Sequence, residues 1–340
     1  MKAEDLKYSD IITIEKLFQA WDEFKREKRG KKEVQRFERT LEDNIFDLFG
    51  DLKKKTYRHG TYQDFYVADP KKRHIHKSNI RDRILHHLLY TYLYGLFDKY
   101  FIYDSYSCRK EKGTHKSVQR LATLSRIVSR NYSVECWALK CDIKKFFASV
   151  DHGILKKLIA RKVKDENIQR LINNVIDSFS SELGYGKGIP LGNLTSQIFS
   201  NIYLNELDQF VKHSLKIKYY VRYADDFLIL NKSTRLHKEY LNAIEDFLAD
   251  NLKLEMHPRK IFTRKLQWGI DFCGYIVLPH YILPRTKTKK RILKKIKQNN
   301  NYQASQSYLG YFSHANTYKL TQNLKNNIWF WTDFPLQTKK

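Results

Sequence analysis

Apolar residues recur at three- and four-residue steps along the first hundred residues, which is the periodicity of amphipathic helices. The first 50 residues predict two helices separated at Gly30, and the apolar positions of the second are Val34, Phe37, Leu41, Ile45 and Leu48. A basic, strand-like segment follows Asp69-Pro70, and Asp82 is the expected cap of a long helix after it. The apolar stripe of that helix consists of Ile84, Leu85, Leu88, Leu89, Tyr92, Leu93, Leu96 and Phe97.

From about residue 135 the pattern changes to strands mixed with helices. Between 139 and 144 apolar and polar residues alternate, which places Asp142 on the polar face of a strand. The segments 217–222 and 227–230 predict a hairpin, and Leu252, Leu254 and Met256 alternate as in a further strand. Helices are expected between these strands at 154–159, 195–213 and 235–250. The resulting β-α-β-β-α-β order predicts an α+β fold with an antiparallel sheet backed by helices on one face.

The chain is strongly basic and rich in aromatic residues. Its 340 residues include 63 Lys and Arg against 37 Asp and Glu, a net charge of +26, together with 20 Phe, 23 Tyr and 5 Trp. The aromatic content excludes a disordered chain, and the charge predicts a polyanionic partner. No apolar run approaches the ~18–20 residues of a membrane span, and the N-terminus does not resemble a signal peptide. Four cysteines without metal-ligand spacing fit a reducing compartment, so we expect a cytoplasmic protein without a membrane partner.

Two segments concentrate the positive charge. Residues 25–32 carry six basic residues and one acid, and residues 285–297 carry eight basic residues and no acid. In the second segment Ile292, Leu293 and Ile296 have helical spacing, so a helix should dock by this stripe and turn its basic residues outward. A solvated surface is the simplest explanation of such a segment, but the net charge and the interleaved aromatic residues favour contact with a nucleic-acid backbone.

Three carboxylates carry the candidate chemistry. Asp225 and Asp226 stand side by side at the predicted hairpin tip, where their charges repel unless a cation is present. An exposed turn would also accept such a pair, but the strand of Asp142 is expected to neighbour this hairpin. Three converging carboxylates suit Mg²⁺. Two Mg²⁺ ions, for which Mn²⁺ is a substitute, would activate a hydroxyl and stabilise leaving pyrophosphate, the chemistry of nucleotidyl transfer.

Seven motifs, in order along the chain, resemble those of reverse transcriptases. The carboxylates lie in two of them, Tyr223-Ala224-Asp225-Asp226 and the segment 142–152, and the segment 188–197 lies between these two. The remaining motifs are at 81–84, 105–110, 254–260 and 272–275. The resemblance covers about 65–315 and implies an RNA-directed DNA polymerase that copies template RNA into cDNA from dNTPs.

The same resemblance implies a right-hand polymerase with fingers, an antiparallel-sheet palm and a small helical thumb. The fingers would span 51–135 and the palm 136–278, with a fingers segment inserted near 150–190. Residues 279–340 would form a basic thumb, and residues 1–50 a helical extension of unassigned role. A basic channel between fingers and thumb would hold an RNA–DNA duplex.

The resemblance assigns roles to the acids and to one lysine. Asp142 and Asp225 would be the main ligands of both metal ions, with Asp226 in support. Ile143, directly after the first acid, would belong to the metal and nucleotide sites. Lys260 resembles the lysine that protonates leaving pyrophosphate, a general-acid role for which an ordinary surface lysine is the alternative.

The nucleotide site is assigned in the same way. Phe147 resembles the ring beneath the incoming sugar, which would clash with a 2′-hydroxyl and select deoxynucleotides; a core aromatic residue is the alternative. Arg73 resembles the fingertip base that clamps the triphosphate, with Lys71 as a companion. The hairpin at 268–275 resembles the primer grip.

Two further residues of the nucleotide site depart from the usual motif. Most reverse transcriptases carry Gln and Pro where this chain has Leu191 and Gln197. This variant, with the segment 307–316, resembles the enzymes of diversity-generating retroelements, whose copying is error-prone opposite template adenine. Leu can only fill space where Gln could donate a hydrogen bond, which narrows the free-energy gap between right and wrong nucleotides. The implied partners are a basic accessory variability determinant protein and a structured retroelement RNA.

Three alternatives remain open on the sequence. The chain could be a group II intron-type or phage-defence reverse transcriptase, although no maturase-type extension follows residue 340 and no zinc-ligand cluster is present. It could be a non-catalytic RNA-binding scaffold, which intact acids disfavour. An RNA-dependent RNA polymerase is disfavoured by Phe147.

Overall fold

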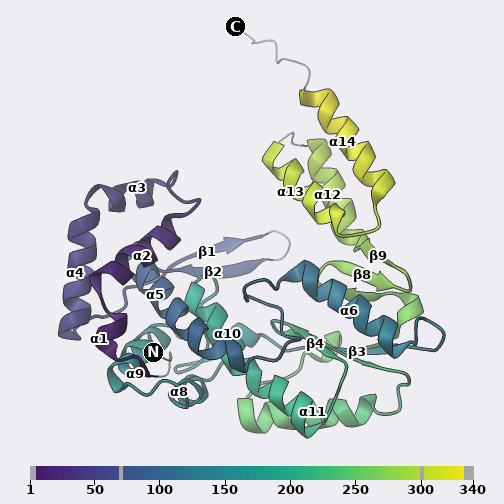
Figure 1. The fold of residues 1–340 in the computed structure, drawn as a ribbon, viewed down its shortest axis with the longest axis horizontal. Coiled ribbons are helices and arrows are strands. Elements are labelled where there is room, and N and C mark those ends of the chain that lie inside the picture. The colour runs from purple at the N-terminus through teal and green to yellow at the C-terminus, as the bar shows by residue number, and fades with distance from the viewer. Residues whose placement is uncertain (1–4, 69–71, 299–301, 333–340) are drawn as a thin grey trace.

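The computed structural model describes residues 5–68, 72–298 and 302–332. Figure 1 shows the helices of the first hundred residues at one side and a separate group of C-terminal helices at the other side, with strands between them. The mixture of helices and antiparallel strands is the α+β class that the sequence predicts. Within the described ranges, no helix combines the length and the apolar character that crossing a membrane requires.

The N-terminal region contains more helices than the two predicted. They are α1 (Tyr8–Ile11), α2 (Ile14–Lys25), α3 (Lys32–Arg39) and α4 (Leu41–Lys54). The break near Gly30 is confirmed, but the single helix expected over 34–48 is wrong because Thr40 leaves helical geometry, with φ −123° and ψ 48°. Asn44 Nδ2 donates to the carbonyl of Phe37 at 3.0 Å and so caps the end of α3. The break lets the ring of Phe37 stack on the ring of Trp21, with 5.3 Å between the two ring centroids.

A hairpin and a long helix follow. They are β1 (Gln63–Val67), β2 (Arg73–Lys77) and α5 (Ile80–Phe97). The apolar stripe predicted for α5 is confirmed as buried. The predicted cap is wrong: Asn79 is the N-cap, and its Oδ1 accepts the Asp82 amide at 2.9 Å. Asp82 is fully buried instead, where it accepts hydrogen bonds from Tyr57 Oη at 2.7 Å and from the Gly60 amide at 3.0 Å.

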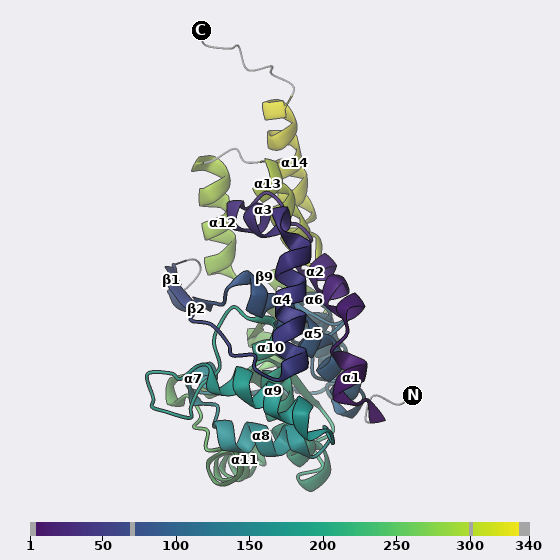
Figure 2. The same ribbon diagram turned by 90° about the vertical axis from the view of Figure 1, so that its left-hand side faces the viewer.

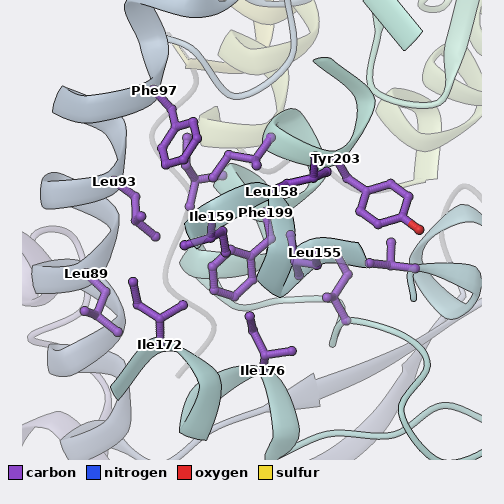
Figure 3. Close-up of a cluster of buried hydrophobic side chains, with 14 of the residues drawn as sticks. Leu89, Leu93, Phe97, Leu155, Leu158, Ile159, Ile172, Ile176, Phe199 and Tyr203 are labelled. Atoms are coloured by element: carbon purple, nitrogen blue, oxygen red, sulfur yellow. The ribbon is translucent and has the colours of Figure 1, made fainter. Parts of the chain in front are cut away.

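The largest hydrophobic core lies beside α5. Figure 3 shows Leu89, Leu93 and Phe97 of this helix facing apolar side chains of three other helices. Those helices are α8 (His152–Ala160), α9 (Glu166–Asp177) and α10 (Leu194–Gln209). The helix expected over 195–213 is present, but its α-helical part ends at Gln209. A π-helical turn, Phe210–Ser214, continues it.

The central sheet has four antiparallel strands in the order β4-β5-β3-β6. They are β3 (Trp137–Asp142), β4 (Tyr220–Tyr223), β5 (Asp226–Asn231) and β6 (Phe262–Lys265). The prediction that the strand of Asp142 neighbours the hairpin is confirmed. The strand expected over 252–256 is wrong, because Leu252 ends helix α11 (His237–Leu252) and Lys253 is left-handed, with φ +48°. Only Met256 forms a bridge, to Ile143.

Both faces of this sheet are covered, whereas the sequence predicts helices on one face. Leu139 and Ile229 belong to the core shared with α10 and α11. On the opposite face, Ala138 and Leu228 pack in a second core with helix α6 (Thr114–Val128). Figure 1 shows this helix beside the strands of the sheet. The prediction fails because the second face is polar only at the end that carries the acids and apolar over the rest.

A second sheet joins the centre to the C-terminal helices. Its strands are β7 (Ile270–Phe272), β8 (Tyr275–Leu278) and β9 (Tyr281–Pro284), so the hairpin expected at 268–275 is present and a third strand extends it. Helices α12 (Thr286–Gln298), α13 (Tyr302–Ser313) and α14 (Tyr318–Thr332) stand beyond it in Figures 1 and 2. Ile292 of α12 packs with Phe312 and Leu324, which confirms the predicted docking stripe.

The predicted domain boundaries agree with this order of elements but stay predictions. Helix α6 lies within the range 51–135 assigned to the fingers, yet it packs on the central sheet. The segment 150–190 contains α8 and α9, which pack with α5 as an inserted fingers segment should.

Candidate active site

The three predicted acids lie at one end of the central sheet. Asp142 is the last residue of β3, and the register places it directly opposite Asp226, the first residue of β5. Asp225 occupies the turn just before β5, and its carbonyl accepts the Ile143 amide at 3.2 Å. Directly opposed residues of an antiparallel pair have Cβ atoms about 4.5–5.5 Å apart. Local alternation and strand pairing therefore bring the carboxylates together as the sequence predicts.

The turn that carries Asp225 is fixed from the opposite face of the sheet. Ala224 has φ +53°, and Arg222 Nη1 donates to its carbonyl at 3.1 Å. The guanidinium also makes two bonds to Asp208, at 2.7 and 2.6 Å, and neither side chain is exposed. Tyr220 Oη donates to the same carboxylate at 2.8 Å. A rigid, fully bonded group thus holds a backbone conformation that is uncommon for alanine.

Two lysines neutralise part of the negative charge. Lys260 Nζ donates to Asp142 Oδ1 at 2.6 Å, and Lys140 Nζ lies 3.0 Å from Asp226 Oδ2. Burial raises the pKa of Asp226 to about 6 despite the opposing effect of Lys140. Burial and the charge of Asp142 also raise the pKa of Asp225, which Lys260 and Arg73 counteract. The acids therefore form one electrostatic unit whose excess negative charge favours a cation.

The donor set suits a hard divalent cation, although it is not assembled as a ready site. Asp226 Oδ1 is buried and has no hydrogen-bond partner, so it is an oxygen available for a metal ion. Across the described ranges, no three His, Cys, Asp or Glu side chains stand close enough to form a metal site. Lys260 occupies Oδ1 of Asp142, an oxygen that a metal ion would also need, whereas Lys140 engages only Oδ2 of Asp226. Ile143 is 1% exposed, so only its backbone could reach such an ion.

The β1–β2 hairpin brings the basic residue predicted at the fingertip, Arg73, toward these acids. Arg73, exposed at the start of β2, is close enough for its charge to lower the pKa of Asp225. The predicted companion Lys71 lies outside the described residues. The His76 amide donates to the carbonyl of Leu191 at 2.9 Å, which ties the hairpin to the middle motif. Gly192 has φ +109°, and a Cβ there would lie 2.9 Å from Cγ2 of Ile75, so glycine permits this close approach.

The other predicted nucleotide residues differ in how far they are exposed. Phe147 is partly buried on the short helix α7 (Phe146–Ser149), whereas its neighbour Phe146 is 2% exposed and belongs to the core. Leu191 is partly buried, and Gln197 is exposed on α10. The availability of Phe147 agrees with a role beside the incoming sugar, and the assignments of Phe147, Leu191 and Gln197 stay predictions.

Two residues that the sequence analysis left unassigned support the site. Asn193 is 3% exposed; its Nδ2 donates to the carbonyl of His76 at 2.9 Å and its Oδ1 accepts from Ser78 Oγ at 2.8 Å. Lys140 is 8% exposed despite its charge. The position of Lys140, two residues before Asp142 on the polar face of a strand, is a signal in the sequence that it lies near the acids. The residues that it contacts are distant in the sequence.

The geometry and the sequence identify the class of the protein. A four-stranded antiparallel palm with acids at one end, a fingertip hairpin and a helical thumb define a nucleic-acid polymerase shaped like a right hand. The model of the family "Reverse transcriptase (RNA-dependent DNA polymerase)" matches residues 53–277. The chain therefore belongs to the reverse transcriptase family.

Curated relatives are distant but cover much of the chain. The group II intron-encoded protein LtrA of Lactococcus lactis subsp. cremoris is 23% identical over 303 residues, covering 69% of this chain and 49% of the relative. Protein YkfC of Escherichia coli (strain K12) is 23% identical over 232 residues, covering 58% of this chain and 60% of the relative. The chain thus spans about half the length of these relatives.

Solved structures share the fold. Apo telomerase from Candida tropicalis superposes with a TM-score of 0.53 at 12% identity, covering 74% of this chain and 51% of that one. Telomerase from Candida albicans, in complex with a fragment of telomeric RNA, gives a TM-score of 0.50 at 13% identity, covering 68% of this chain and 47% of that one. These likenesses confirm the predicted right-hand polymerase fold.

Proposed function

We propose that this chain is an RNA-directed DNA polymerase that makes cDNA, with errors opposite template adenine, for a diversity-generating retroelement. The observation that carries the polymerase activity is the placement of Asp142 opposite Asp226, with Asp225 in the adjoining turn. Family membership over 53–277 supports the same chemistry. Nucleotidyl transfer needs mainly positioning and charge neutralisation, which an acidic edge on a rigid sheet can supply.

The acids are the proposed ligands of two Mg²⁺ ions, with Mn²⁺ as a substitute. Asp142 and Asp225 hold both ions, Asp226 supports them, and Ile143 contributes its backbone. When bound, these ions neutralise phosphate charge and activate the primer hydroxyl. Lys260, whose side chain is 42% exposed and whose ammonium is bonded to Asp142, is the proposed proton donor to leaving pyrophosphate.

The proposed substrates are dNTPs. Phe147 excludes a 2′-hydroxyl by its ring, and its partial exposure next to the buried Phe146 supports that role. Arg73 binds the triphosphate through the N–H groups of its planar guanidinium, and Lys71 assists in binding the same triphosphate. The electrostatic effect of Arg73 on Asp225 supports this assignment, because such an effect requires the hairpin to approach the acids.

Template RNA and the growing cDNA are the proposed macromolecular ligands. The net charge of +26 favours a duplex held through its phosphates, so affinity should fall steeply with salt. Helix α12 supports this role, because its apolar stripe faces the other thumb helices and its sequence carries basic residues but no acid.

The retroelement assignment depends on Leu191 and Gln197. Leu191 is held at the hairpin by the hydrogen bond between its carbonyl and the His76 amide, so its aliphatic side chain is well placed to influence the nascent pair. This type of enzyme implies a basic accessory variability determinant protein and a structured retroelement RNA as partners. The proposed location is the cytoplasm of a bacterial, archaeal or phage-infected cell.

A group II intron-type or phage-defence reverse transcriptase is the second candidate. The relative LtrA, a group II intron-encoded protein, aligns with 69% of this chain and supports this candidate. The two candidates share the polymerase chemistry and differ in fidelity. Neighbouring DNA that carries two near-identical repeats differing only at adenines would favour the retroelement.

Primer extension followed by cDNA sequencing tests the proposal. The full chain is given a defined RNA template, a DNA primer, dNTPs and Mg²⁺, beside Asp225→Ala and the remote control Lys212→Met. DNA synthesis by the wild type and the control, but not by Asp225→Ala, supports the polymerase. Equal synthesis in Asp225→Ala contradicts the catalytic assignment. Errors concentrated opposite adenine support the retroelement, whereas uniform accuracy favours the second candidate.

A further inference from the structure

Lys140 is a buried lysine in the centre of the palm. The residue is 8% exposed, and its ammonium lies about equally far, at 6.0 Å, from the ring centroids of Phe262 and Phe272. A buried ammonium is costly unless it is paired and hydrogen-bonded. Its two polar contacts are Asp226 Oδ2 at 3.0 Å and the carbonyl of Asp271, which accepts from Nζ at 2.8 Å.

At the first contact Lys140 orients a candidate metal ligand. The ammonium engages Oδ2 of Asp226, while Oδ1 of the same carboxylate is buried without a partner. Asp142 stands directly across the ladder, so the lysine also offsets repulsion between two opposed acids. The carboxylate is therefore held with one oxygen neutralised and the other available.

The second contact connects Asp226 to a different part of the fold. Asp271 is the middle residue of β7, in the β7–β8 hairpin that resembles the primer grip. The Asp271 side chain accepts from Arg285 Nε at 2.9 Å, and Arg285 directly precedes the thumb helix α12. The Arg285 amide donates to the carbonyl of Gly274 at the tip of the same hairpin, at 2.9 Å. A single ammonium thus joins a palm acid to a hairpin that is anchored to the base of the thumb.

We propose that Lys140 is a positioning residue for nucleotidyl transfer, which fixes the primer-grip hairpin relative to Asp226. The primer 3′-hydroxyl, carried by the hairpin, would then stand at a constant distance from the phosphate of the incoming dNTP. A displacement of about 1 Å in such a geometry can cost about 100-fold in rate. The inference rests on the proposed polymerase function and adds a residue that this function does not otherwise require.

The test compares Lys140→Met with a matched lysine elsewhere. Lys212 is also largely buried, with a side chain 20% exposed, and its Nζ donates to the carbonyl of Lys218 at 2.7 Å and lies 3.9 Å from Asp104 Oδ2. It touches neither the acids nor the β7–β8 hairpin through these contacts. Lys212→Met therefore removes a lysine of similar environment without breaking the proposed link.

Steady-state kinetics should separate positioning from substrate binding. Lys140→Met should lower kcat about 10–100-fold and leave the KM for dNTP within about threefold. In an Asp226→Asn background, the same substitution should cost less than about threefold more, because the residue through which Lys140 acts is already altered. Lys212→Met should leave kcat unchanged. Equal kcat losses in the two methionine variants, or additive losses with Asp226→Asn, would overturn the proposal.

Amide hydrogen exchange supplies a measurement that needs neither activity nor metal. In the free chain, residues 270–278 should exchange faster in Lys140→Met than in the wild type and in Lys212→Met. Unchanged exchange there overturns the link even if the chain proves to have another activity. A wild type that makes no DNA refutes the polymerase function, and the exchange comparison still decides whether the link exists.

A conservative variant keeps the proposal testable if Lys140→Met does not fold. Lys140→Arg retains the charge and a donor for both acceptors, so it should keep normal exchange at 270–278 and a kcat within about tenfold of the wild type. A folded Lys140→Arg with kcat as low as that of Asp226→Asn contradicts the proposal.

Discussion

The two faces of the palm sheet each carry an ion pair, and the two pairs are built differently. On the face covered by α10 and α11, Arg222 and Asp208 are fully buried, and the carboxylate accepts bonds from the guanidinium and from Tyr220 Oη. On the opposite face, Lys140 meets only one oxygen of Asp226 and leaves the other buried without a partner. One pair is saturated with hydrogen bonds, and the other is left open on one side.

This difference distinguishes a structural pair from the pair for which we propose a function. A saturated buried pair gains nothing from a ligand, and removing one partner leaves an uncompensated charge at a cost of about 3–5 kcal/mol. An unsatisfied carboxylate oxygen is destabilising by itself but becomes favourable when a cation arrives. We therefore expect the first face to serve rigidity and the second to serve the proposed chemistry.

The largest effect is expected on the open face. Asp142→Asn should reduce primer extension by more than about 10³-fold, since charge neutralisation is most of phosphoryl-transfer catalysis. The free energy of unfolding should change by less than about 1 kcal/mol, because two effects offset each other. The variant loses the partly exposed ion pair with Lys260, but it also removes the repulsion from the opposed Asp226. Primer extension and urea unfolding check both parts. A large loss of stability would show that the open face is also structural.

The opposite result is expected on the saturated face. Asp208→Ala should lower the free energy of unfolding by about 3–5 kcal/mol because Arg222 is left buried and unpaired. Its control is Asp177→Ala, which removes a partly exposed pair with Lys156 at 2.6 Å and should cost less than about 1 kcal/mol. Urea unfolding compares the two variants. Equal, small losses would contradict the distinction between the faces.

The sugar contact gives a smaller effect on the open side. Phe147→Ala should reduce the preference for dNTP over rNTP, measured as a ratio of kcat/KM, by about 10–100-fold, since steric exclusion of the 2′-hydroxyl is lost. Phe46→Ala, which removes a ring 56% exposed on α4, should leave the preference unchanged. An unaltered preference in Phe147→Ala would make Phe147 a packing residue.

The smallest effect concerns fidelity. Leu191→Gln should lower misincorporation opposite template adenine about tenfold, corresponding to about 1.4 kcal/mol of regained discrimination. Sequencing of cDNA measures the change, with Leu183→Gln at an exposed position as the control. An unchanged error spectrum would remove Leu191 from the determinants of error.

Local periodicity was sufficient for most elements but not for their ends. The stripe of α5 and the alternation around Asp142 are properties of a few neighbouring residues, and both predictions are confirmed. The break at Thr40 and the cap at Asn79 were missed because each depends on a competition among nearby polar residues that hydropathy does not register. Leu254 fits the alternating pattern of a strand, yet its amide donates a hydrogen bond to the carbonyl of Leu248 near the end of α11.

The candidate site shows the same limit. Family motifs located Asp142, Asp225 and Asp226, and the strand order brings them to one edge. The partner of Lys140 on β7 is 131 residues away, so no local pattern could indicate that the lysine would be buried. The contact between Asn193 and the fingertip hairpin was missed for the same reason.

Helix α2 lies along α5, with the ring of Phe24 4.9 Å from the Arg83 guanidinium and 5.9 Å from the His87 ring. The stretch that matches the family begins at residue 53, so the segment recognisable by ancestry is shorter than the segment that folds. A protein shortened to the matched residues would expose to water the side of α5 that α2 covers, and we expect it to aggregate. Minimal versions of this polymerase should therefore retain the first helices.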